Sequence, residues 1–348
     1  MNAPELLARL RQPSDAGLTL RLKTLTPLYT GGIGQLGDQV HPSNLLGGLR
    51  HMSCLVARTL GDADFEGTVW GNAGGGGNKA AAKQVGLHWN TAGLERKALP
   101  AEIKVPRDDG GKDSRWWFNT GFEGELGLQL TRNGISDRRW QMLLIALAIQ
   151  LRHGSFGAKD QFGLGVLAPV ESLSFCAPLD VAAEWPKAVA AQAGHLNLLR
   201  HAFTKLRFRA APGQRPTLNR ETALKLALGT RATLRNALRA KVDAPEAERN
   251  RLTELRHQML GKLNQFGSAV NASAAYLVGE AVELRIVAAL KPEDKDVRAE
   301  IMKAFRAATT NLDSAIESTG YRLDDSTWEF GGKYINERAA WLNKLAGV

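Results

Sequence analysis

The sequence has few of the residues on which disulfide scaffolds, zinc sites and membrane spans depend. Cys54 and Cys176 are the only cysteines among 348 residues, and two cysteines so far apart form neither a zinc site nor a disulfide framework. The longest apolar stretches, such as Met142–Ile149, are far shorter than the ~20 residues of a membrane span. The N-terminus has no basic region followed by an apolar core, so no secretory signal is expected. These absences favour a reducing, cytoplasmic location.

Enzyme signatures are missing too. The sequence contains no HExxH, GxxxxGK[ST] or GxSxG motif and no cysteine pair with metal-binding spacing. Seven histidines are scattered along the chain, and no paired carboxylates occur at helical spacing in an apolar setting. Asp38 lies in a glycine-rich loop and is a conceivable metal ligand beside RNA, but a lone loop aspartate is more often a turn residue. We therefore expect no catalytic residue, no metal and no cofactor.

Positive charge is abundant and unevenly spread. The formal net charge is +10, and residues 195–260 alone hold 14 Lys and Arg against five Asp and Glu. Clustered positive charge suits a polyanion, because cationic side chains that bind phosphates release counterions. A solvated basic face, or a patch that meets an acidic protein, explains the same charge equally well.

Hydrophobic periodicity predicts an α+β protein with two similar halves. Period-two alternation or apolar runs indicate strands, and apolar residues at helical spacing indicate amphipathic helices. In the first half the expected strands are 18–25, 84–90, 115–131 and 166–175, and the helices 42–60 and 136–152. In the second half the expected strands are 205–209 and 282–290, and the helices 219–240, 245–263 and 296–316. This order fits two tandem ferredoxin-like domains, 1–177 and 196–348, with a linker at 178–195 and a long glycine-rich insertion loop at 71–83.

The first motif combines a glycine turn with a helix start. Gly31 and Gly32 follow a predicted strand, and adjacent glycines let the backbone approach a ligand closely. Pro42 then opens a helix that Ser43 or Asn44 can cap. The N–H groups at such a helix start attract anions, and Arg50 inside the helix can donate two hydrogen bonds to a phosphate. The alternative is an ordinary strand–helix turn whose arginine pairs with a carboxylate.

Two further features point to nucleic acid. The loop 154–165 interleaves four glycines with Phe156, Phe162 and Lys159, and aromatic rings stack on bases while lysine meets phosphates. The alternative for this loop is a surface hairpin. Three arginines at intervals of four residues, Arg231, Arg235 and Arg239, form one predicted stripe on a helix. That stripe suits a row of phosphates as well as it suits solvent.

The motifs together resemble the RAMP superfamily, and most closely the subunit-one family of the Cmr complex, a type III-B CRISPR effector. The resemblance rests on three stretches of sequence in the first half: Thr26-Pro27-Leu28-Tyr29-Thr30-Gly31-Gly32, His41-Pro42-Ser43-Asn44-Leu45-Leu46-Gly47-Gly48-Leu49-Arg50 and Trp70-Gly71-Asn72. The later stretches Gln161-Phe162-Gly163-Leu164-Gly165 and Gln265-Phe266-Gly267-Ser268 resemble the family's glycine-rich loop and its second-half turn.

The sequence departs from the family pattern at two places. His41 stands where the family usually has arginine, and His51-Met52-Ser53-Cys54 replaces an aromatic run that ends in arginine. Arg58 lies one turn further along the predicted helix and is a candidate substitute.

The resemblance implies a non-catalytic RNA-binding subunit of an antiviral ribonucleoprotein. Its expected partners are guide (CRISPR) RNA toward the 3′ end, the complementary target RNA and neighbouring RAMP subunits, with no membrane. The RNA-binding residues that follow from the family and the charge pattern are these: Gly31, Gly32, His41, Ser43, Asn44, Arg50, Arg58, Phe156, Lys159, Gln161, Phe162, Arg231, Arg235 and Arg239.

Two other readings remain open at this stage. One is an endoribonuclease of the same superfamily, with His41 as a base or Asp38 as a metal ligand. The other is a structural protein whose basic second half docks on an acidic partner. The salt dependence of the binding constant separates phosphate binding from the other readings, because each phosphate contact makes the decrease of affinity with salt steeper.

Overall fold

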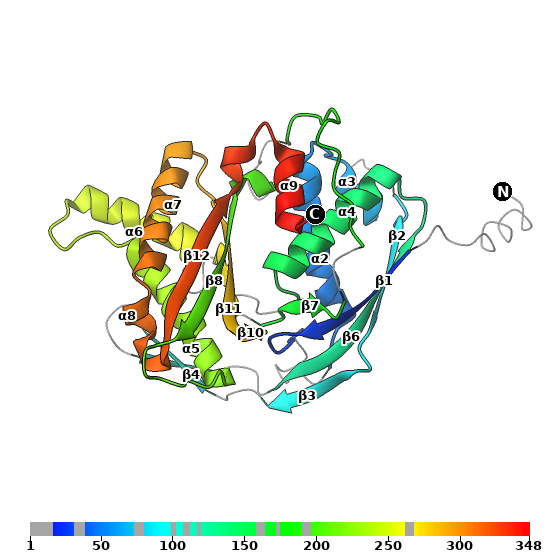
Figure 1. The fold of residues 1–348 in the computed structure, drawn as a ribbon. Coiled ribbons are helices and arrows are strands. Elements are labelled where there is room, and N and C mark those ends of the chain that lie inside the picture. Colours follow the sequence, from blue (N-terminus) through cyan, green and yellow to red (C-terminus); the bar gives the residue numbers. More distant parts are fainter. Residues whose placement is uncertain are drawn as a thin grey trace, which may run out of the picture.

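The computed structural model describes residues 17–30, 39–72, 80–98, 102–106, 112–116, 120–157, 164–171, 175–189, 196–261 and 268–348. Within these residues the protein is a mixed α+β structure with two five-stranded antiparallel sheets, each with helices packed against it (Figure 1). The predicted α+β class and the presence of two sheets are confirmed.

The first sheet combines β1, which precedes the motif at residues 26–50, with strands that follow this motif in the sequence. It has the strand order β2-β6-β1-β7, and β3 pairs with the early part of β6. Its strands and helices, with the separate hairpin β4–β5, are β1 Leu18–Thr24, α2 Pro42–Thr59, α3 Phe65–Val69, β2 Val85–Asn90, β3 Leu94–Ala98, β4 Glu102–Pro106, β5 Lys112–Trp116, β6 Thr120–Arg132, α4 Asp137–His153 and β7 Leu167–Pro169. Leu22 and Leu128 are fully buried beneath α2 and α4, whereas Thr19 and Gln129 are exposed on the opposite face.

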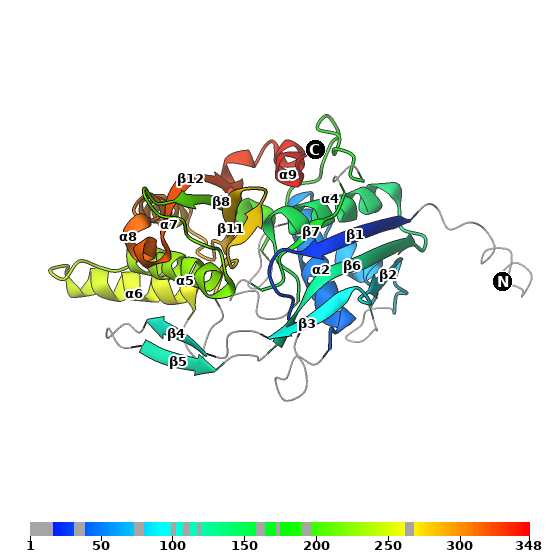
Figure 2. The same ribbon diagram turned by 60° about the horizontal axis from the view of Figure 1, so that its bottom comes forward.

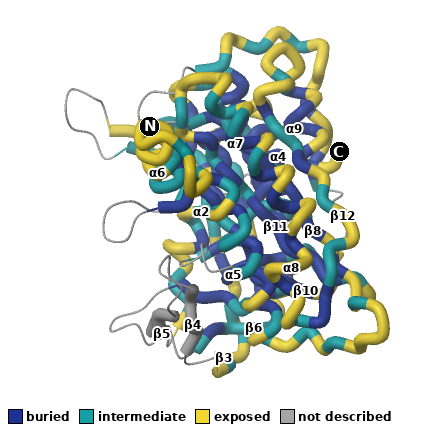
Figure 3. The backbone as a smooth tube through the Cα atoms, turned by 90° about the vertical axis from the view of Figure 1, so that its left-hand side faces the viewer, coloured by how far each residue is buried: buried dark blue, intermediate teal, exposed yellow. Residues whose placement is uncertain are grey.

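The second sheet repeats this arrangement. Its order is β10-β11-β8-β12, and β9 pairs with β11. Its elements are β8 His201–Ala210, α5 Arg220–Ala237, α6 Glu246–Leu260, β9 Val270–Ala272, β10 Tyr276–Val278, β11 Ala281–Ala289, α7 Lys295–Thr310, α8 Asp313–Ile316 and β12 Tyr321–Phe330, followed by α9 Arg338–Ala346. Helices α5 and α7 cover one face of the sheet, and α6 is largely exposed (Figures 1 and 3).

The two halves share one chain order and one sheet order. In each, a first strand, a pair of helices, a run of further strands, at least one helix and a last strand follow in sequence. The first strand, β1 or β8, lies in the sheet between the last strand and the third, β6 or β11. The division of the chain at residues 177 and 196 remains a prediction.

Helix α4 and helix α9 join the halves. Almost every position from Trp140 to Leu151 is buried, as expected for a helix that is apolar on all sides and surrounded by protein. The C-terminal helix α9 returns to α4, and its Trp341 and Leu342 are fully buried in the core that contains α2 and α4 (Figure 1). Arg220, the first residue of α5, also pairs with Glu123 of β6, with 2.8 Å between Nη2 and Oε1.

Several boundaries differ from the sequence predictions. The strand expected at 166–175 covers only Leu167–Pro169, and residues 172–174 lie outside the described part of the chain. The helix expected at 296–316 ends at Thr310, and a short separate helix follows at Asp313–Ile316. No helix among the described residues combines the length and the apolar character needed to cross a membrane.

Candidate nucleic-acid interface

Thr30 closes the first motif onto the start of α2. Its hydroxyl accepts a hydrogen bond from the backbone N–H of His41 at 2.8 Å and donates to the carbonyl of Gln39 at 3.3 Å. The side-chain amide of Asn44 donates to the carbonyl of Thr30. The described ends of the glycine segment 31–38 are therefore held together at the first turn of α2.

Helix α2 begins without a side-chain cap. His41 is the N-cap residue, and no side chain accepts a hydrogen bond from the first turn, which contains no acidic residue. The predicted caps, Ser43 and Asn44, are therefore wrong, and the Asn44 amide instead bonds to Thr30. Since the first turn of this 18-residue helix itself contains no acidic residue to offset its positive end, this turn suits an anionic group such as phosphate.

The base of the second glycine loop is attached to the same place. The backbone N–H of Phe156 donates to the carbonyl of Gly165 at 2.8 Å, and the N–H of Gly165 donates to the carbonyl of Pro27 at 2.9 Å. Gly157 has φ +90° and Gly165 φ +82°. A Cβ at Gly157 would lie 2.4 Å from the carbonyl oxygen of Tyr29. Only glycine fits this approach of the loop base to residues 27–30.

Helix α2 also packs closely on this loop base. A Cβ at Gly48 would lie 3.2 Å from Nε2 of Gln150 and 3.4 Å from the carbonyl oxygen of Ser155. The Gln150 amide donates to that same carbonyl. The described residues on either side of 31–38 and of 158–163 thus meet the start of α2 at one location. We call this location the glycine junction and define it as residues 27–30, 39–44, 48, 154–157 and 164–165.

The predicted role of Phe156 in stacking on a base is wrong. Its side chain is 1% exposed, and its ring meets that of Trp89 edge to face with 5.9 Å between centroids. A ring buried in the core is not available to stack on a base, so Phe156 anchors the loop base instead.

Six other predicted residues lie outside the described part of the chain: Gly31, Gly32, Asp38, Lys159, Gln161 and Phe162. Of the remaining candidates, His41 is half-buried, Ser43 and Asn44 are exposed on the first turn of α2, and Arg50 is exposed in the middle of that helix.

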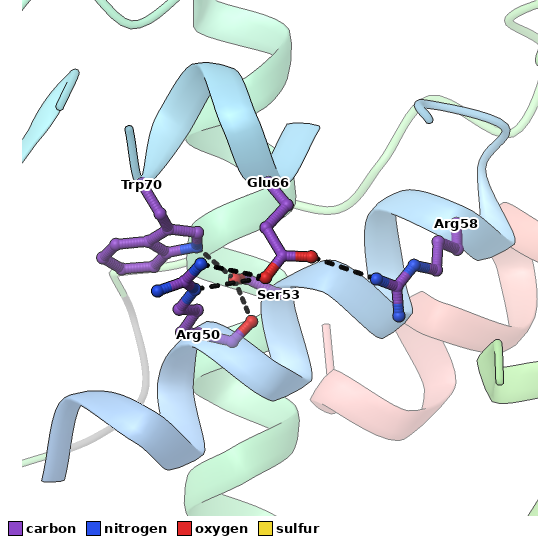
Figure 4. Close-up of polar contacts among 5 residues, drawn as sticks. All are labelled: Arg50, Ser53, Arg58, Glu66 and Trp70. Carbon is purple, nitrogen blue, oxygen red and sulfur yellow. Dashed lines mark hydrogen bonds and ion pairs between the residues drawn. The ribbon is translucent and has the colours of Figure 1, made fainter. Parts of the chain in front are cut away.

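Arg50 and Arg58 converge on one carboxylate. Arg50 donates from Nε and Nη2 to Oε1 of Glu66 at 3.2 and 3.1 Å, and Nη2 of Arg58 lies 3.1 Å from Oε2 (Figure 4). The two arginines share a face of α2, and Glu66 comes from α3. Two cations share one anion, so the group keeps a net positive charge along the middle and last turns of α2.

The Trp70-Gly71-Asn72 turn positions α3 and hence Glu66. The indole N–H of Trp70 donates to the Ser53 hydroxyl at 3.0 Å, and that hydroxyl donates to the carbonyl of Arg50 at 2.9 Å (Figure 4). Gly71 follows with φ +82°, and Asn72 pairs with Ala81 through two backbone hydrogen bonds. Sequence reasoning missed Glu66, although two arginines on one helix face are a signal for a shared anion.

The arginine stripe on α5 is shorter than predicted. Helix α5 ends at Ala237, with Leu238 as its C-cap, so Arg231 and Arg235 lie on the helix and Arg239 lies beyond it. Leu234 and Leu238 are buried. The segment after Leu238 leads to α6, which starts after Pro245. Arg239 lies in this segment, so it does not continue the four-residue spacing of the arginines on α5.

Catalytic chemistry finds little support in the described side chains. No group of three or more His, Cys, Asp or Glu among them is placed to hold a metal ion. Burial raises the pKa of the Cys54 and Cys176 thiols to about 12, so neither is a thiolate nucleophile at neutral pH.

Comparison with known proteins gives matches among solved structures alone. No protein-family model matches the sequence, and a search of curated proteins found no match. The apo crystal structure of Cmr1 from Pyrococcus furiosus aligns with 12% identity over 90% of this chain and 98% of that chain, with a TM-score of 0.39.

Two cryo-EM structures of type III-B Cmr-beta also align. One is bound to cognate target RNA, with 11% identity over 84% of this chain and 99% of that chain, and a TM-score of 0.46. The other is bound to cognate target RNA and AMPPnP in the presence of ssDNA, with 9% identity over 86% and 100% and a TM-score of 0.45. The chain is similar to these Cmr structures over most of its length.

Proposed function

We propose that this chain is a non-catalytic RNA-binding RAMP subunit of a type III CRISPR ribonucleoprotein effector. In this role it contacts guide RNA toward the 3′ end, complementary target RNA and neighbouring subunits in antiviral defence. The observation that carries the proposal is the glycine junction. There the motifs that resemble the RAMP superfamily are held together by the hydrogen bonds of Thr30, Asn44 and Gly165.

The chemistry of the junction suits an RNA backbone. The first turn of α2 presents N–H groups with neither an acidic residue nor a side-chain cap. Further along α2, outside the junction itself, Arg50 and Arg58 add a net positive charge that Glu66 only partly offsets. Backbone N–H groups and arginines are the groups that hold phosphates in register without reading sequence.

The shared order of the two halves supports the ferredoxin-like part of the proposal. A chain order of strand, helix, strand, strand, helix, strand with the first strand beside the last and the third is the ferredoxin-like arrangement. We assign one such domain to each half.

Binding at the junction is tested by one added negative charge. Ser43→Asp places a carboxylate in the first turn of α2, where the helix dipole stabilises it by ~0.3–1 kcal/mol. RNA affinity should fall while thermal stability is kept or rises. Gln129→Glu is the matched control, because it makes the same change in net charge on the exposed face of the first sheet. Fluorescence anisotropy with a labelled single-stranded RNA measures the affinity of each variant. Equal affinities of Ser43→Asp and Gln129→Glu would exclude the junction as the binding site.

An endoribonuclease of the same superfamily is the second candidate. The observation in its favour is that His41 lies at the junction, half-buried and fixed through its backbone N–H to Thr30. A histidine base acts without metal. Incubating wild-type protein and a His41→Ala, Asp38→Ala double variant with labelled RNA separates the two functions. Cleavage by the wild type that the double variant loses would replace the non-catalytic proposal.

Assembly is tested in the native host. A tagged copy purified in mild salt should bring guide RNAs with uniform repeat-derived 5′ ends, together with other RAMP subunits. A monomer free of nucleic acid would overturn the proposed function.

A further inference from the structure

The second sheet presents a charged face to the first half of the molecule. Along β8 and β11, alternate residues such as Leu206 and Leu284 are buried against α5 and α7. The residues between them point to the other face, and the register places Lys205 opposite Arg285 and Arg207 opposite Glu283. We call these four residues, with Arg152 of α4 nearby, the charged sheet face.

Arg285 holds this face against the end of α4. The Arg285 side chain is almost fully buried. It donates from Nη1 to the carbonyls of Leu151 at 2.7 Å and Gly154 at 3.3 Å. It also donates from Nε to the Tyr276 hydroxyl at 2.7 Å. Gly154 begins the second glycine loop, so the charged sheet face adjoins the glycine junction.

The buried acid of this face, Glu283, is already engaged, and Asp325 of β12 lies opposite Arg207 in the register. Glu283 is buried, and its Oε1 lies 3.0 Å from Nε of Arg207. The Lys205 ammonium group makes no hydrogen bond or ion pair with any other residue in the described part of the chain. Its ammonium group is therefore the open cation of the face.

The arrangement costs folding free energy. Lys205 and Arg285 are like charges directly opposite each other on paired strands, which is destabilising. Burial, then Arg285, lowers the pKa of Lys205 to about 8. Arg152 and Arg207 act in the same direction, and Glu283 opposes them. An anion bound beside Lys205 would offset this cost, as expected of a surface selected for binding.

We propose that the charged sheet face binds a phosphodiester group of an RNA strand, with Lys205 as the contacting cation. The face extends the glycine junction across Arg285 toward the second half, so one strand can pass from the start of α2 to β8. The inference rests on the proposed function, because it assigns a second contact for the same ligand.

The test compares two lysines that lose the same charge. Lys205→Gln is measured beside Lys225→Gln, which lies on α5 on the far side of the sheet, exposed and paired with Glu221 at 2.8 Å. The probe is a labelled single-stranded oligouridine, titrated by fluorescence anisotropy at several salt concentrations. Lys205→Gln should weaken binding roughly tenfold and reduce the salt slope by ~0.7, the value for one phosphate contact on a single strand. Lys205→Arg should retain most of the affinity.

The outcomes separate this inference from the proposed function. Equal affinities of Lys205→Gln and Lys225→Gln, with wild-type protein that binds RNA, would overturn the inference and leave the proposed function standing. A loss of binding to polyglutamate but not to RNA would reassign the face to an acidic protein. Wild-type protein that binds no RNA would overturn both.

A second measurement does not require a variant. Acetylation of Lys205 in the wild-type protein, followed by mass spectrometry, should slow when the oligouridine is added, while acetylation of Lys225 stays unchanged. Equal rates with and without RNA would contradict the inference.

Discussion

At the scale of single residues, Gly165 fixes where the second glycine loop begins and ends. It has φ +82°, and a Cβ there would lie 1.8 Å from the carbonyl oxygen of Phe156. Two backbone hydrogen bonds depend on this close approach: the N–H of Phe156 donates to the carbonyl of Gly165, and the N–H of Gly165 donates to the carbonyl of Pro27. Glycine is therefore required at this position by geometry, whatever the loop contacts.

Gly165→Ala should destabilise the protein by roughly 2–4 kcal/mol, from backbone strain and steric overlap. The control is Gly47→Ala on α2, where a Cβ has no atom within 4 Å. That change should stabilise the protein by roughly 0.5–1 kcal/mol, because glycine is a poor helix residue. Urea denaturation followed by circular dichroism measures both. A Gly165→Ala variant as stable as the wild type would contradict the assigned geometry.

Lys205 supplies a second prediction, on pH. Folding lowers its pKa from 10.5 to about 8, so between these values the folded chain has lost a proton that the unfolded chain still binds. Wild-type stability should then rise with pH relative to Lys205→Met. Below pH 8, where both states bind the proton and the folded state has a buried charge, the variant should be the more stable. This advantage should vanish toward pH 10.5 in thermal melts, and an advantage that is constant across this range would contradict the assigned environment.

Residues that act through one local feature were predictable from sequence, and those that depend on tertiary neighbours were not. The start of α2 at Pro42 was predicted because helix starts have local signatures, whereas the binding roles of Gly31, Gly32, Ser43 and Arg50 stay predictions. Phe156 was misassigned because an aromatic between glycines looks the same whether it faces solvent or the core, and its contact with Trp89 comes from a distant strand.

At the scale of elements, α3 is a five-residue helix whose main role is to present Glu66. Its carboxylate holds Arg50 and Arg58, and Trp70 ties the helix to Ser53. These ion pairs are partly exposed, with Glu66 39% accessible, so they contribute little to stability. Their main effect is on the orientation and charge of the two arginines.

Glu66→Gln should therefore tighten RNA binding while the unfolding free energy changes by less than about 1 kcal/mol. The substitution raises the positive charge beside α2 by one unit and keeps a side chain of the same shape. Glu300→Gln is the control, because Glu300 also pairs with an arginine, Arg251, on the second half away from the junction. Anisotropy titrations at fixed salt provide the comparison. Unchanged affinity for Glu66→Gln would mean that these arginines do not meet RNA.

Long amphipathic helices were placed within a few residues because their apolar spacing is regular and their ends are marked. Ser136 caps α4 and Asn219 caps α5. Strand β12 escaped prediction because Tyr321–Phe330 has no clean alternation, and its register shifts between Leu323 and Asp325. Helix α9 escaped for a different reason: its buried face packs on α4, about 190 residues earlier in the chain.

At the scale of the whole molecule, the two halves are bound into one unit by α9 and by Arg285. Figure 2 shows α9 above α4, at the boundary between the two sheets. Trp341 is fully buried there and lies 6.2 Å from the ring of Phe203 in β8, between centroids. The last helix of the second half thus completes the core of the first, and neither half buries its apolar surface alone.

Trp341→Ala should destabilise the protein by about 3–5 kcal/mol, the usual cost of removing a buried tryptophan. Because the cavity opens where both halves meet, the melting temperature should fall in a single transition monitored by probes in either half. Trp185→Ala is the control, since Trp185 packs partly exposed against Arg138, 4.2 Å from its ring centroid, and should cost much less. Two separate transitions in the Trp341→Ala melt would show that the halves fold independently. The charged sheet face would then lie between domains free to move, rather than on a fixed path from the glycine junction.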